Sequence, residues 1–394
     1  MKIIERRIAS IVTPELAAKV QKHVERISAI NSGYPALTDW HPVIPDGWGQ
    51  HPRVPYARAL VYSGEAATFA YSHHQTICKF RDRYVVSWSN GLVHEDYPGQ
   101  EVHYAWSEDG LNWSEPRVLV HTPVASKLVR NNAGLLAWDD RLYCYVCVAN
   151  DFGRESVSPG MSSLDNQAMQ LDVYETTDLV HWKHYPGIND SIYLFEAPRP
   201  TQEGKLICAG FALTDPTQGL VLVWDSGTNP TNRPRVIQVP RSEVKPEQGT
   251  WYQTDDGTLY LFWRDGTWSG TLGLSTSQDG GETWSPPLQT DMQNSFSRAY
   301  AGRLPDGRYY IVGNNYNVLL DRRHLQIALS DDGLSFDRMY TLVEGPTSRR
   351  INGRHKEDGY HYPNCLADGD KLLVTYSVNK EDIEVGTVRI GDLS

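Results

Sequence analysis

The chain has 394 residues, 40% of them hydrophobic, and a formal net charge of −11 at pH 7. This composition can supply a buried core. The acidic balance argues against nucleic acid or an anionic membrane as a partner, because both attract basic surfaces. No segment contains the roughly 18 consecutive apolar residues of a membrane-spanning helix, so we expect no membrane partner.

A single helix is predicted near the N-terminus. Thr13, Pro14 and Glu15 form a helix start, with a capping hydroxyl, a first-turn proline and an acid near the positive end of the helix dipole. The opening residues MKIIERRIASIV lack the apolar centre of a secretory signal, so we expect a cytoplasmic protein. Apolar residues recur at helical spacing at Leu16, Val20, Val24, Ile27 and Ile30.

The five cysteines are expected to be buried thiols in a reducing compartment, not a disulfide framework or a zinc site. Cys144 and Cys147 form a C-x-x-C pattern, but they lie within the apolar run Leu142–Val148. The alternation of side chains along a strand would direct these two thiols to opposite faces of a sheet.

From about Phe69 the chain consists of six strand–turn–strand units. Steps of 50 to 64 residues separate their turns, and a propeller blade of four short strands needs about 40–50 residues plus loops. We therefore predict an all-β fold, a single six-bladed propeller over residues 68–394, with a seventh irregular blade as the alternative. Residues 1–67 would supply the helix, a loop and a strand near Arg58–Ser63 that closes the ring. The turns centre near Asp82, Asp140, Gly204, Gly257, Gly307 and Gly369.

A second repeat marks another corner of the blades. Ser107–Trp113, Ser277–Trp284 and Ser330–Phe336 share a Ser, an Asp, a Gly and a terminal aromatic, and Thr176–Trp182 is a degenerate copy. The Asp can cap backbone N–H groups, the Gly supplies positive φ, and the aromatic packs into the blade. These segments resemble the Asp-box repeats of the sialidase-type propellers, which implies a structural role for their Asp residues.

Polar residues recur where the predicted inner strands begin and end, so we expect a polar pocket on the propeller axis. His73 and His74 are adjacent in a strand, and alternation predicts that only one of them faces the axis. We assign catalytic roles to His73, His74, Tyr362 and Glu247. We assign substrate binding to Arg264, Arg298, Asn131, Asn132, Glu196, His361, Asn315 and Lys380.

The resemblance to sialidases is incomplete. Their first carboxylate-binding arginine would fall on His73-His74-Gln75 and is absent, whereas Arg264 before Ser277 and Tyr362 match later parts of the pattern. The chain is closer in character to propeller-type polysaccharide lyases and rhamnosidases that act on rhamnose–glucuronate linkages, as in ulvan. That resemblance implies β-elimination at a uronate. Arg would neutralise the carboxylate, and His or a tyrosine (Tyr143, Tyr145 or Tyr362) would move the protons.

The function expected from the sequence is an exo-acting lyase on an acidic oligosaccharide. A glycoside hydrolase of the rhamnosidase or sialidase type and a non-catalytic glycan-binding propeller are the alternatives. Glu196 and Glu247 could be the paired carboxylates of a glycosidase, or ion-pair partners of Arg199 and Arg264. No cofactor is predicted, because His73, His74, His355 and His361 show no metal-ligand spacing. The sugar, its linkage and the oligomeric state stay open.

Overall fold

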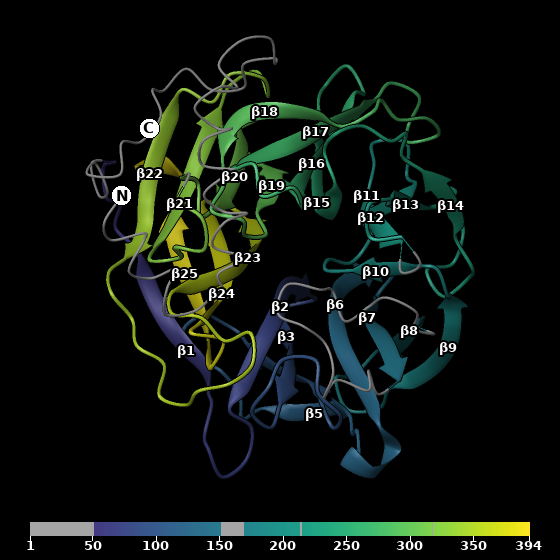
Figure 1. Cartoon of the computed structure of the whole chain (residues 1–394), viewed down its shortest axis with the longest axis vertical. Coiled ribbons are helices and arrows are strands. Elements are labelled where there is room, and N and C mark those ends of the chain that lie inside the picture. Colours follow the sequence, from purple (N-terminus) through teal and green to yellow (C-terminus); the bar gives the residue numbers. More distant parts are fainter. Residues whose placement is uncertain (1–50, 151–168, 213–214, 317) are drawn as a thin grey trace.

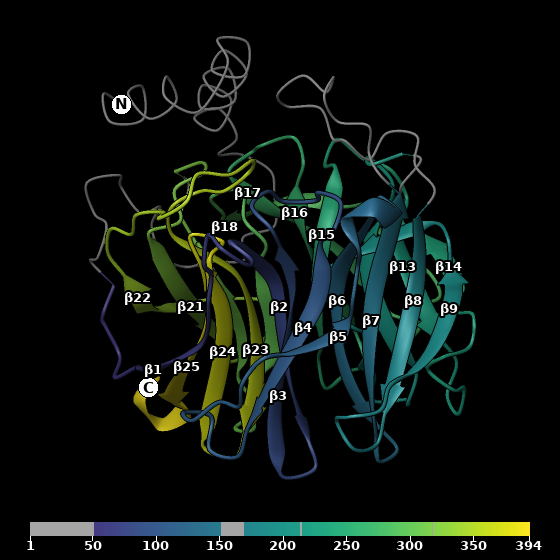
Figure 2. The same ribbon diagram turned by 90° about the horizontal axis from the view of Figure 1, so that it is seen from below.

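The computed structural model describes residues 51–150, 169–212, 215–316 and 318–394. These residues form six antiparallel sheets arranged around a central axis (Figure 1). Figure 2 shows the same sheets from the side, with their strands running in roughly the same direction. The predicted all-β, six-bladed propeller is therefore confirmed. The helix predicted from Thr13 lies outside the described residues.

Each blade has four main strands, and the chain passes through the blades in order. The first blade contains β2 (Tyr71–Phe80), β3 (Arg83–Gly91), β4 (Glu101–Ser107) and β5 (Arg117–Val120), and the second contains β6 (Leu128–Trp138), β7 (Arg141–Asn150), β8 (Met169–Thr176) and β9 (Lys183–Asn189). The third contains β10 (Ile192–Leu194), β11 (Arg199–Pro200), β12 (Leu206–Ala212), β13 (Gly219–Trp224) and β14 (Arg235–Gln238), and the fourth contains β15 (Pro246–Gln253), β16 (Leu259–Asp265), β17 (Thr271–Ser277) and β18 (Leu288–Gln293).

The last two blades complete the ring. The fifth contains β19 (Tyr300–Arg303), β20 (Tyr309–Gly313), β21 (His324–Ser330) and β22 (Arg338–Glu344), and the sixth contains β23 (Tyr360–Asp368), β24 (Lys371–Val378), β25 (Asp382–Arg389) and β1 (Ala57–Ser63). Two short 3₁₀ helices lie at Val124–Ser126 and Ile390–Asp392. Five of the six turns predicted from the sequence join the first two strands of a blade, and the turn at Gly204 joins the short strand β11 to β12.

The ring is closed by a strand from early in the chain. β1 pairs antiparallel with β25, with Ala57 opposite Thr387 and Ser63 opposite Asp382. Ser63 Oγ also donates to Asp382 Oδ1 at 2.9 Å. The sixth blade therefore takes three strands from the C-terminal part of the chain and its outer strand from residues 57–63, as the sequence predicted. This pairing covers the edge that β25 would otherwise expose.

The Asp-box segments are tight turns held by one carboxylate each. Asp109 Oδ1 accepts the backbone N–H groups of Leu111 and Asn112, both at 2.8 Å. Asp332 Oδ1 accepts the backbone N–H groups of Leu334 and Ser335 in the same way, at 2.7 and 2.8 Å. The degenerate copy does likewise through Asp178, and Leu179 there has φ of 60°, a conformation that Gly110 and Gly333 supply elsewhere. The Asp residues are thus structural.

The apolar core lies between neighbouring blades. Cys144 packs in a cluster with Val85 and Val102 of the first blade, whereas Cys147 packs with Leu206 and other residues of the third. These two thiols therefore lie on opposite faces of β7, as alternation predicts. All five cysteines are buried and free. Within the described ranges, no helix has both the length and the apolar character needed to cross a bilayer.

Candidate active site

Side chains from the inner strands of several blades meet around Tyr362, at the start of β23. Its ring centroid lies 4.2 Å from that of His73 on β2 and 6.4 Å from that of Phe195, which follows β10. Gln248 on β15 and Arg264 on β16 each place an N–H donor 2.8 Å from the Tyr362 hydroxyl oxygen. The inner strands β2, β15 and β23 surround the centre of the ring in Figure 1. Tyr362, one of the three tyrosines that the sequence left open, is therefore the centre of an axial polar cluster.

Local backbone distortion positions Tyr362. Its φ is 52°, in the left-handed region, and the pairing of β23 with β24 shifts register between His361 and Asn364. Gln75 of the neighbouring blade donates through Nε2 to the carbonyls of His361, at 3.0 Å, and Tyr362, at 2.5 Å. A non-glycine residue in this conformation is strained and persists only where its surroundings determine it. The contacts from Gln75 hold Tyr362 in this conformation.

His73 and His74 do not occupy opposite faces, so this prediction was wrong. The ladder between β2 and β3 shifts register between His73 and Thr76, and His74 has φ of 54°. This bulge interrupts the alternation on which the prediction relied. The two imidazole centroids lie 4.6 Å apart, and that of His74 is 5.8 Å from Tyr362. Both imidazoles therefore belong to the axial cluster.

Two buried guanidinium groups carry N–H donors that have no partner. Arg298 is fully buried, and its Nη2 lies 3.2 Å from Glu196 Oε2, while its Nε and Nη1 are unpartnered. Arg322 contacts His361 Nδ1 at 2.7 Å and the Phe296 carbonyl at 3.2 Å, but its Nε is unpartnered. These N–H groups can therefore donate to an acceptor that binds beside them.

Charge and burial set the protonation of the cluster. Burial, reinforced by Lys380, holds the pKa of His73 well below its usual value. Burial and Arg322 do the same for His361, and burial lowers the pKa of His74 although Glu95 opposes it. Burial alone would raise the pKa of Glu95, but Lys380 and His74 bring it to about 2. At neutral pH the cluster therefore holds neutral imidazoles beside an ionised carboxylate.

The two carboxylates proposed as a catalytic pair are ion-paired. Glu196 Oε1 lies 3.0 Å from Arg199 Nη2, and its other oxygen contacts Arg298. Glu247 accepts Arg264 Nε at 2.8 Å and also contacts Nη2 of the same side chain. Each carboxylate therefore serves first to hold an arginine, which is the second of the two roles that the sequence left open.

Three predicted asparagines make contacts inside the fold. Asn132 Nδ2 donates to the His74 carbonyl at 2.6 Å and so joins the first two blades. Asn131 Nδ2 donates to Asp96 at 2.9 Å, and Asn315 Nδ2 donates to the Ile311 carbonyl at 3.2 Å. These contacts position the backbone around the cluster. Tyr143 and Tyr145, by contrast, are packed in the apolar core.

Sequence reasoning missed several members of the cluster. Glu95 lies between β3 and β4, and its Oε2 accepts Lys380 Nζ at 2.7 Å. Arg322 lies two residues before the start of β21, and its guanidinium carbon is 5.6 Å from the Tyr362 ring centroid. Glu357 pairs with Arg322 at 3.1 Å. None of these residues belongs to a repeat, and the adjacent charges in His94-Glu95-Asp96 and Asp321-Arg322-Arg323 were the only available signals.

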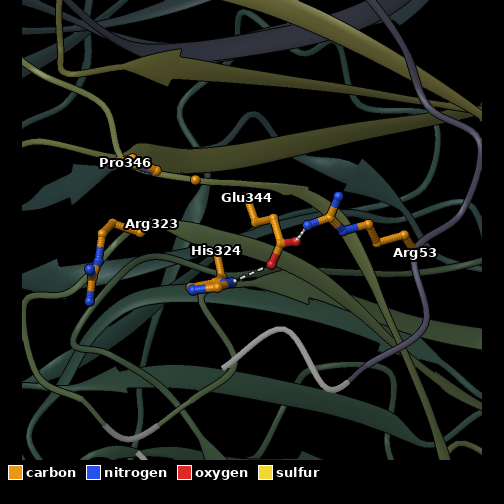
Figure 3. A pocket seen from close by; sticks show the side chains of 6 residues that line it. Arg53, Arg323, His324, Glu344 and Pro346 are labelled. Carbon is orange, nitrogen blue, oxygen red and sulfur yellow. Dashed lines mark ion pairs between the residues drawn. The ribbon is translucent and has the colours of Figure 1, made fainter. Parts of the chain in front are cut away.

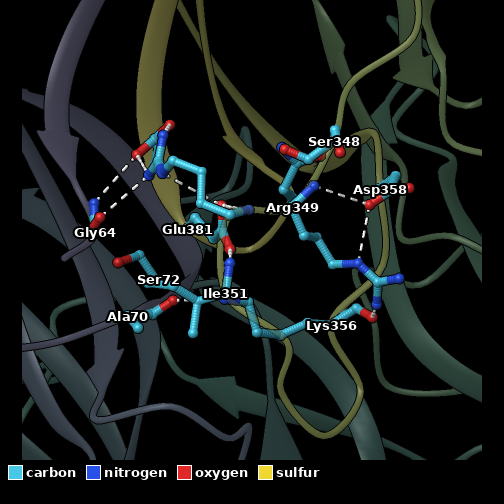
Figure 4. A network of polar contacts seen from close by, with 12 residues as sticks. Gly64, Ala70, Ser72, Ser348, Arg349, Ile351, Lys356, Asp358 and Glu381 are labelled. Atoms are coloured by element: carbon cyan, nitrogen blue, oxygen red, sulfur yellow. Dashed lines mark hydrogen bonds and ion pairs between the residues drawn. The ribbon is translucent and has the colours of Figure 1, made fainter. Parts of the chain in front are cut away.

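A buried ion pair fixes the loop that brings Glu357 to the cluster. Figure 4 shows Lys356 and Glu381 at the centre of this network, with Nζ and Oε1 2.8 Å apart and both side chains fully buried. The backbone N–H groups of Arg350 and Ile351 also donate to Glu381, at 3.0 and 2.8 Å. The Glu381 carboxylate thus fixes the loop between β22 and β23 through these three contacts.

A separate cavity of about 260 Å³ involves none of the residues around Tyr362. Figure 3 shows Glu344 in this cavity, paired with Arg53 and, at 3.2 Å, with His324. Arg323, Gly345 and Pro346 complete its lining. Arg53 and His324 pair with Glu344, and Arg323 pairs with Asp321 outside the lining, so we assign this cavity no function.

The repeats and the fold agree with one known family. The BNR repeat-like domain family matches residues 82–374, which is more than half of the chain. The chain belongs to the BNR repeat-like domain family. No curated protein matches it.

Solved structures with the same fold include a sialidase, with a TM-score of 0.65 and 18% identity over 91% of this chain. This chain covers only 35% of the length of that sialidase. A protein of unknown function from Dyadobacter fermentans has a TM-score of 0.65 and 16% identity, covering 86% of this chain and 99% of its own. The Trypanosoma rangeli sialidase in complex with sialic acid has a TM-score of 0.60 and 14% identity, covering 87% and 60%. At these identities the BNR repeat-like chain shares the sialidase fold, and its activity has to be argued from its own residues.

Proposed function

We propose that this BNR repeat-like propeller is a glycoside hydrolase that acts on an acidic sugar, with Tyr362 as the nucleophile. The observation that carries the proposal is the Tyr362 hydroxyl oxygen, which receives N–H donors from both Arg264 and Gln248 at 2.8 Å. Two donors directed at one oxygen stabilise negative charge there. A phenol oxygen supported in this way is suited to attack an anomeric carbon.

The acidic substrate is proposed from the guanidinium groups around Tyr362. Arg298 and Arg322 keep N–H groups without partners, and a sugar carboxylate would accept these hydrogen bonds with matching charge. Fold neighbours include a sialidase solved with sialic acid, an acidic sugar, which supports this substrate class. The net charge of −11 does not oppose it, because the cationic groups are concentrated locally.

An aromatic pair beside the arginines supports a sugar ligand. Phe296 and Trp268 are stacked with centroids 4.1 Å apart, and both have positive φ, at 60° and 64°. The Arg264 guanidinium lies 4.5 Å from the Phe296 ring centroid, so one arginine connects Tyr362 to this pair. Aromatic faces of this kind pack against the apolar faces of sugar rings.

Substrate screening tests the proposed reaction. Purified protein is incubated with sialosides, glucuronides, rhamnose–glucuronate oligosaccharides and neutral rhamnosides, and the products are weighed by mass spectrometry. Hydrolysis adds the mass of one water across the broken bond, which is the expected result. β-Elimination, expected from the sequence, adds no water and produces an unsaturated uronate that absorbs in the ultraviolet. The hydrolase proposal would be overturned if the products are those of elimination, or if the protein binds these sugars and turns over none of them.

A further inference from the structure

Two imidazoles and a carboxylate converge beside Tyr362 without bonding one another. Ligand-type atoms of His73, His74 and Glu95 all lie within 4.8 Å of one another, and all three residues are buried. His74 Nε2 is 3.6 Å from Glu95 Oε1, which is too long for a hydrogen bond. The proposed hydrolysis assigns no role to these three side chains.

The outer nitrogens of both imidazoles contact hydroxyl groups. His73 Nδ1 lies 2.8 Å from Ser377 Oγ, and His74 Nδ1 lies 3.3 Å from Ser89 Oγ. When Nδ1–H is donated to these hydroxyls, each Nε2 carries a lone pair. His73 Nε2 is buried and has no partner. Metal-binding histidines have this arrangement, in which one ring nitrogen is fixed by a hydrogen bond and the other faces the ion.

Glu95 is oriented by a second contact of the same kind. Its Oε2 accepts Lys380 Nζ at 2.7 Å, and Lys380 also donates to the His355 carbonyl at 2.7 Å. Oε1 is therefore the oxygen that faces His74. The left-handed backbone of His74 places its imidazole on the same side as that of His73, so a strained conformation is maintained where the three groups converge.

We propose that His73 Nε2, His74 Nε2 and Glu95 Oε1 bind one divalent transition-metal ion, with Zn²⁺ as the preferred ion. Zinc accepts imidazole and carboxylate ligands at about 2.0–2.1 Å, and tetrahedral geometry then separates the ligand atoms by about 3.3 Å. His74 Nε2 and Glu95 Oε1 are 3.6 Å apart and all three ligand atoms lie within 4.8 Å of one another, so each pair has to approach by at most about 1.5 Å. Calcium and magnesium prefer oxygen ligands, so two imidazoles favour zinc over them.

Three protein ligands leave a fourth position of the ion open. His73 lies beside Tyr362, with ring centroids 4.2 Å apart, so this position is near the proposed nucleophile. The Lys380 ammonium group donates to Glu95 Oε2 and to the His355 carbonyl, which leaves Glu95 Oε1 to face His74. The metal proposal rests on these contacts and is independent of the hydrolysis proposed above.

Metal binding is measured directly, without a substrate. Tag-free protein is treated with EDTA, dialysed, and titrated with Zn²⁺ by isothermal calorimetry, and Co²⁺ binding is followed by its visible absorption. We expect one Zn²⁺ per chain and a Co²⁺ spectrum typical of four ligands. His73→Ala and Glu95→Gln should each weaken Zn²⁺ binding by about a hundredfold or more, since loss of a supporting contact alone costs about 10–100-fold.

His103→Gln is the matched control. His103 is also buried beside a glutamate in the first blade, but its Nε2 contacts Glu101 at 2.7 Å and its Nδ1 lies 3.2 Å from Asn90 Nδ2. This variant should bind Zn²⁺ like the unmodified protein, and circular dichroism verifies that all variants are folded. The proposal is overturned if the unmodified protein binds no Zn²⁺, or if His73→Ala and Glu95→Gln bind it as well as His103→Gln. Tyr362→Phe should retain metal, so a failure of the hydrolase proposal would leave this result unaffected.

Discussion

Lys356 and Glu381 form a buried ion pair beneath the loop that leads into β23, and Lys356→Met tests its contribution. Lys356 Nζ donates to Glu381 Oε1 and to the Ala70 carbonyl, both at 2.8 Å. Methionine keeps much of the apolar side chain and removes the cation. The Glu381 carboxylate then remains buried without the charge that Lys356 supplied.

The expected loss follows from the contacts that remain. Removing one partner of a buried ion pair usually costs about 3–5 kcal/mol. Glu381 would still accept two backbone N–H groups, and the Arg350 guanidinium lies 3.6 Å from it. These contacts retain part of the compensation, so we expect the free energy of unfolding to fall by about 3 kcal/mol, at the lower end of this range.

Urea denaturation followed by tryptophan fluorescence measures this change through the midpoint and the m value. Lys79→Met is the control, because Lys79 pairs with Asp368 at 2.6 Å but the two side chains are 41% and 26% exposed. An exposed pair of this kind contributes less than about 1 kcal/mol. Equal losses in the two variants would refute the argument that burial makes the Lys356–Glu381 pair important for the loop.

Three further predictions address the Asp boxes, the buried imidazoles and the arginine beside Tyr362. Asp332→Ala should lower the free energy of unfolding by about 1 kcal/mol and leave the turnover of folded protein intact. Asp331, which is 71% exposed, is the control, and Asp331→Ala should change the free energy of unfolding by less than about 0.5 kcal/mol. A large loss of turnover in Asp332→Ala would contradict its structural role. The pKa values of His73, His74 and His361 are lowered in the folded chain, so below about pH 6.5 the unfolded chain binds protons that the folded chain does not, and the free energy of unfolding should fall by up to about 1.4 kcal/mol per pH unit for each imidazole. Urea midpoints measured in EDTA at decreasing pH check this, and midpoints that stay constant down to about pH 5.5 would contradict it. Arg264→Lys loses the forked donor that reaches both Tyr362 and Glu247, so kcat for an acidic substrate should fall about tenfold or more, and an unchanged kcat would argue against its support of the Tyr362 oxygen.

The sequence predicted the features of this fold that repeat. The six turns and the Asp boxes recur with fixed residue types, because the same tight turn between neighbouring strands is needed in blade after blade. The ring-closing strand was predicted because the last blade otherwise lacked one strand. Tyr362 was proposed, with Tyr143 and Tyr145 as competitors, through the resemblance to a family pattern. These predictions depend on local chemistry or on the count of strands within a blade.

The composition of the axial cluster could be predicted only in part. The orientation of His74 depends on a bulge in β2, and the neighbouring residues carry no glycine that would have indicated it. Arg322 and Glu95 reach the cluster from outside the repeated strands, so no spacing rule brings them together. Asn132 lies within the inner strand β6, and its side chain donates to the His74 carbonyl of the preceding blade, a contact that the sequence did not indicate. Contacts between blades determine the orientations of these side chains, and such contacts cannot be derived from local sequence.

Turnover by Tyr362→Phe is the most direct test of the proposed active site. The variant removes only the hydroxyl oxygen that Arg264 and Gln248 contact, and Tyr360→Phe on the same strand serves as the control. On the acidic substrate identified by the screen, we expect Tyr362→Phe to lose turnover by about 10³-fold or more, the scale of losing a nucleophile, while Tyr360→Phe retains it. Near-full turnover in folded Tyr362→Phe would contradict the account, because the axial cluster would then act without the group at its centre.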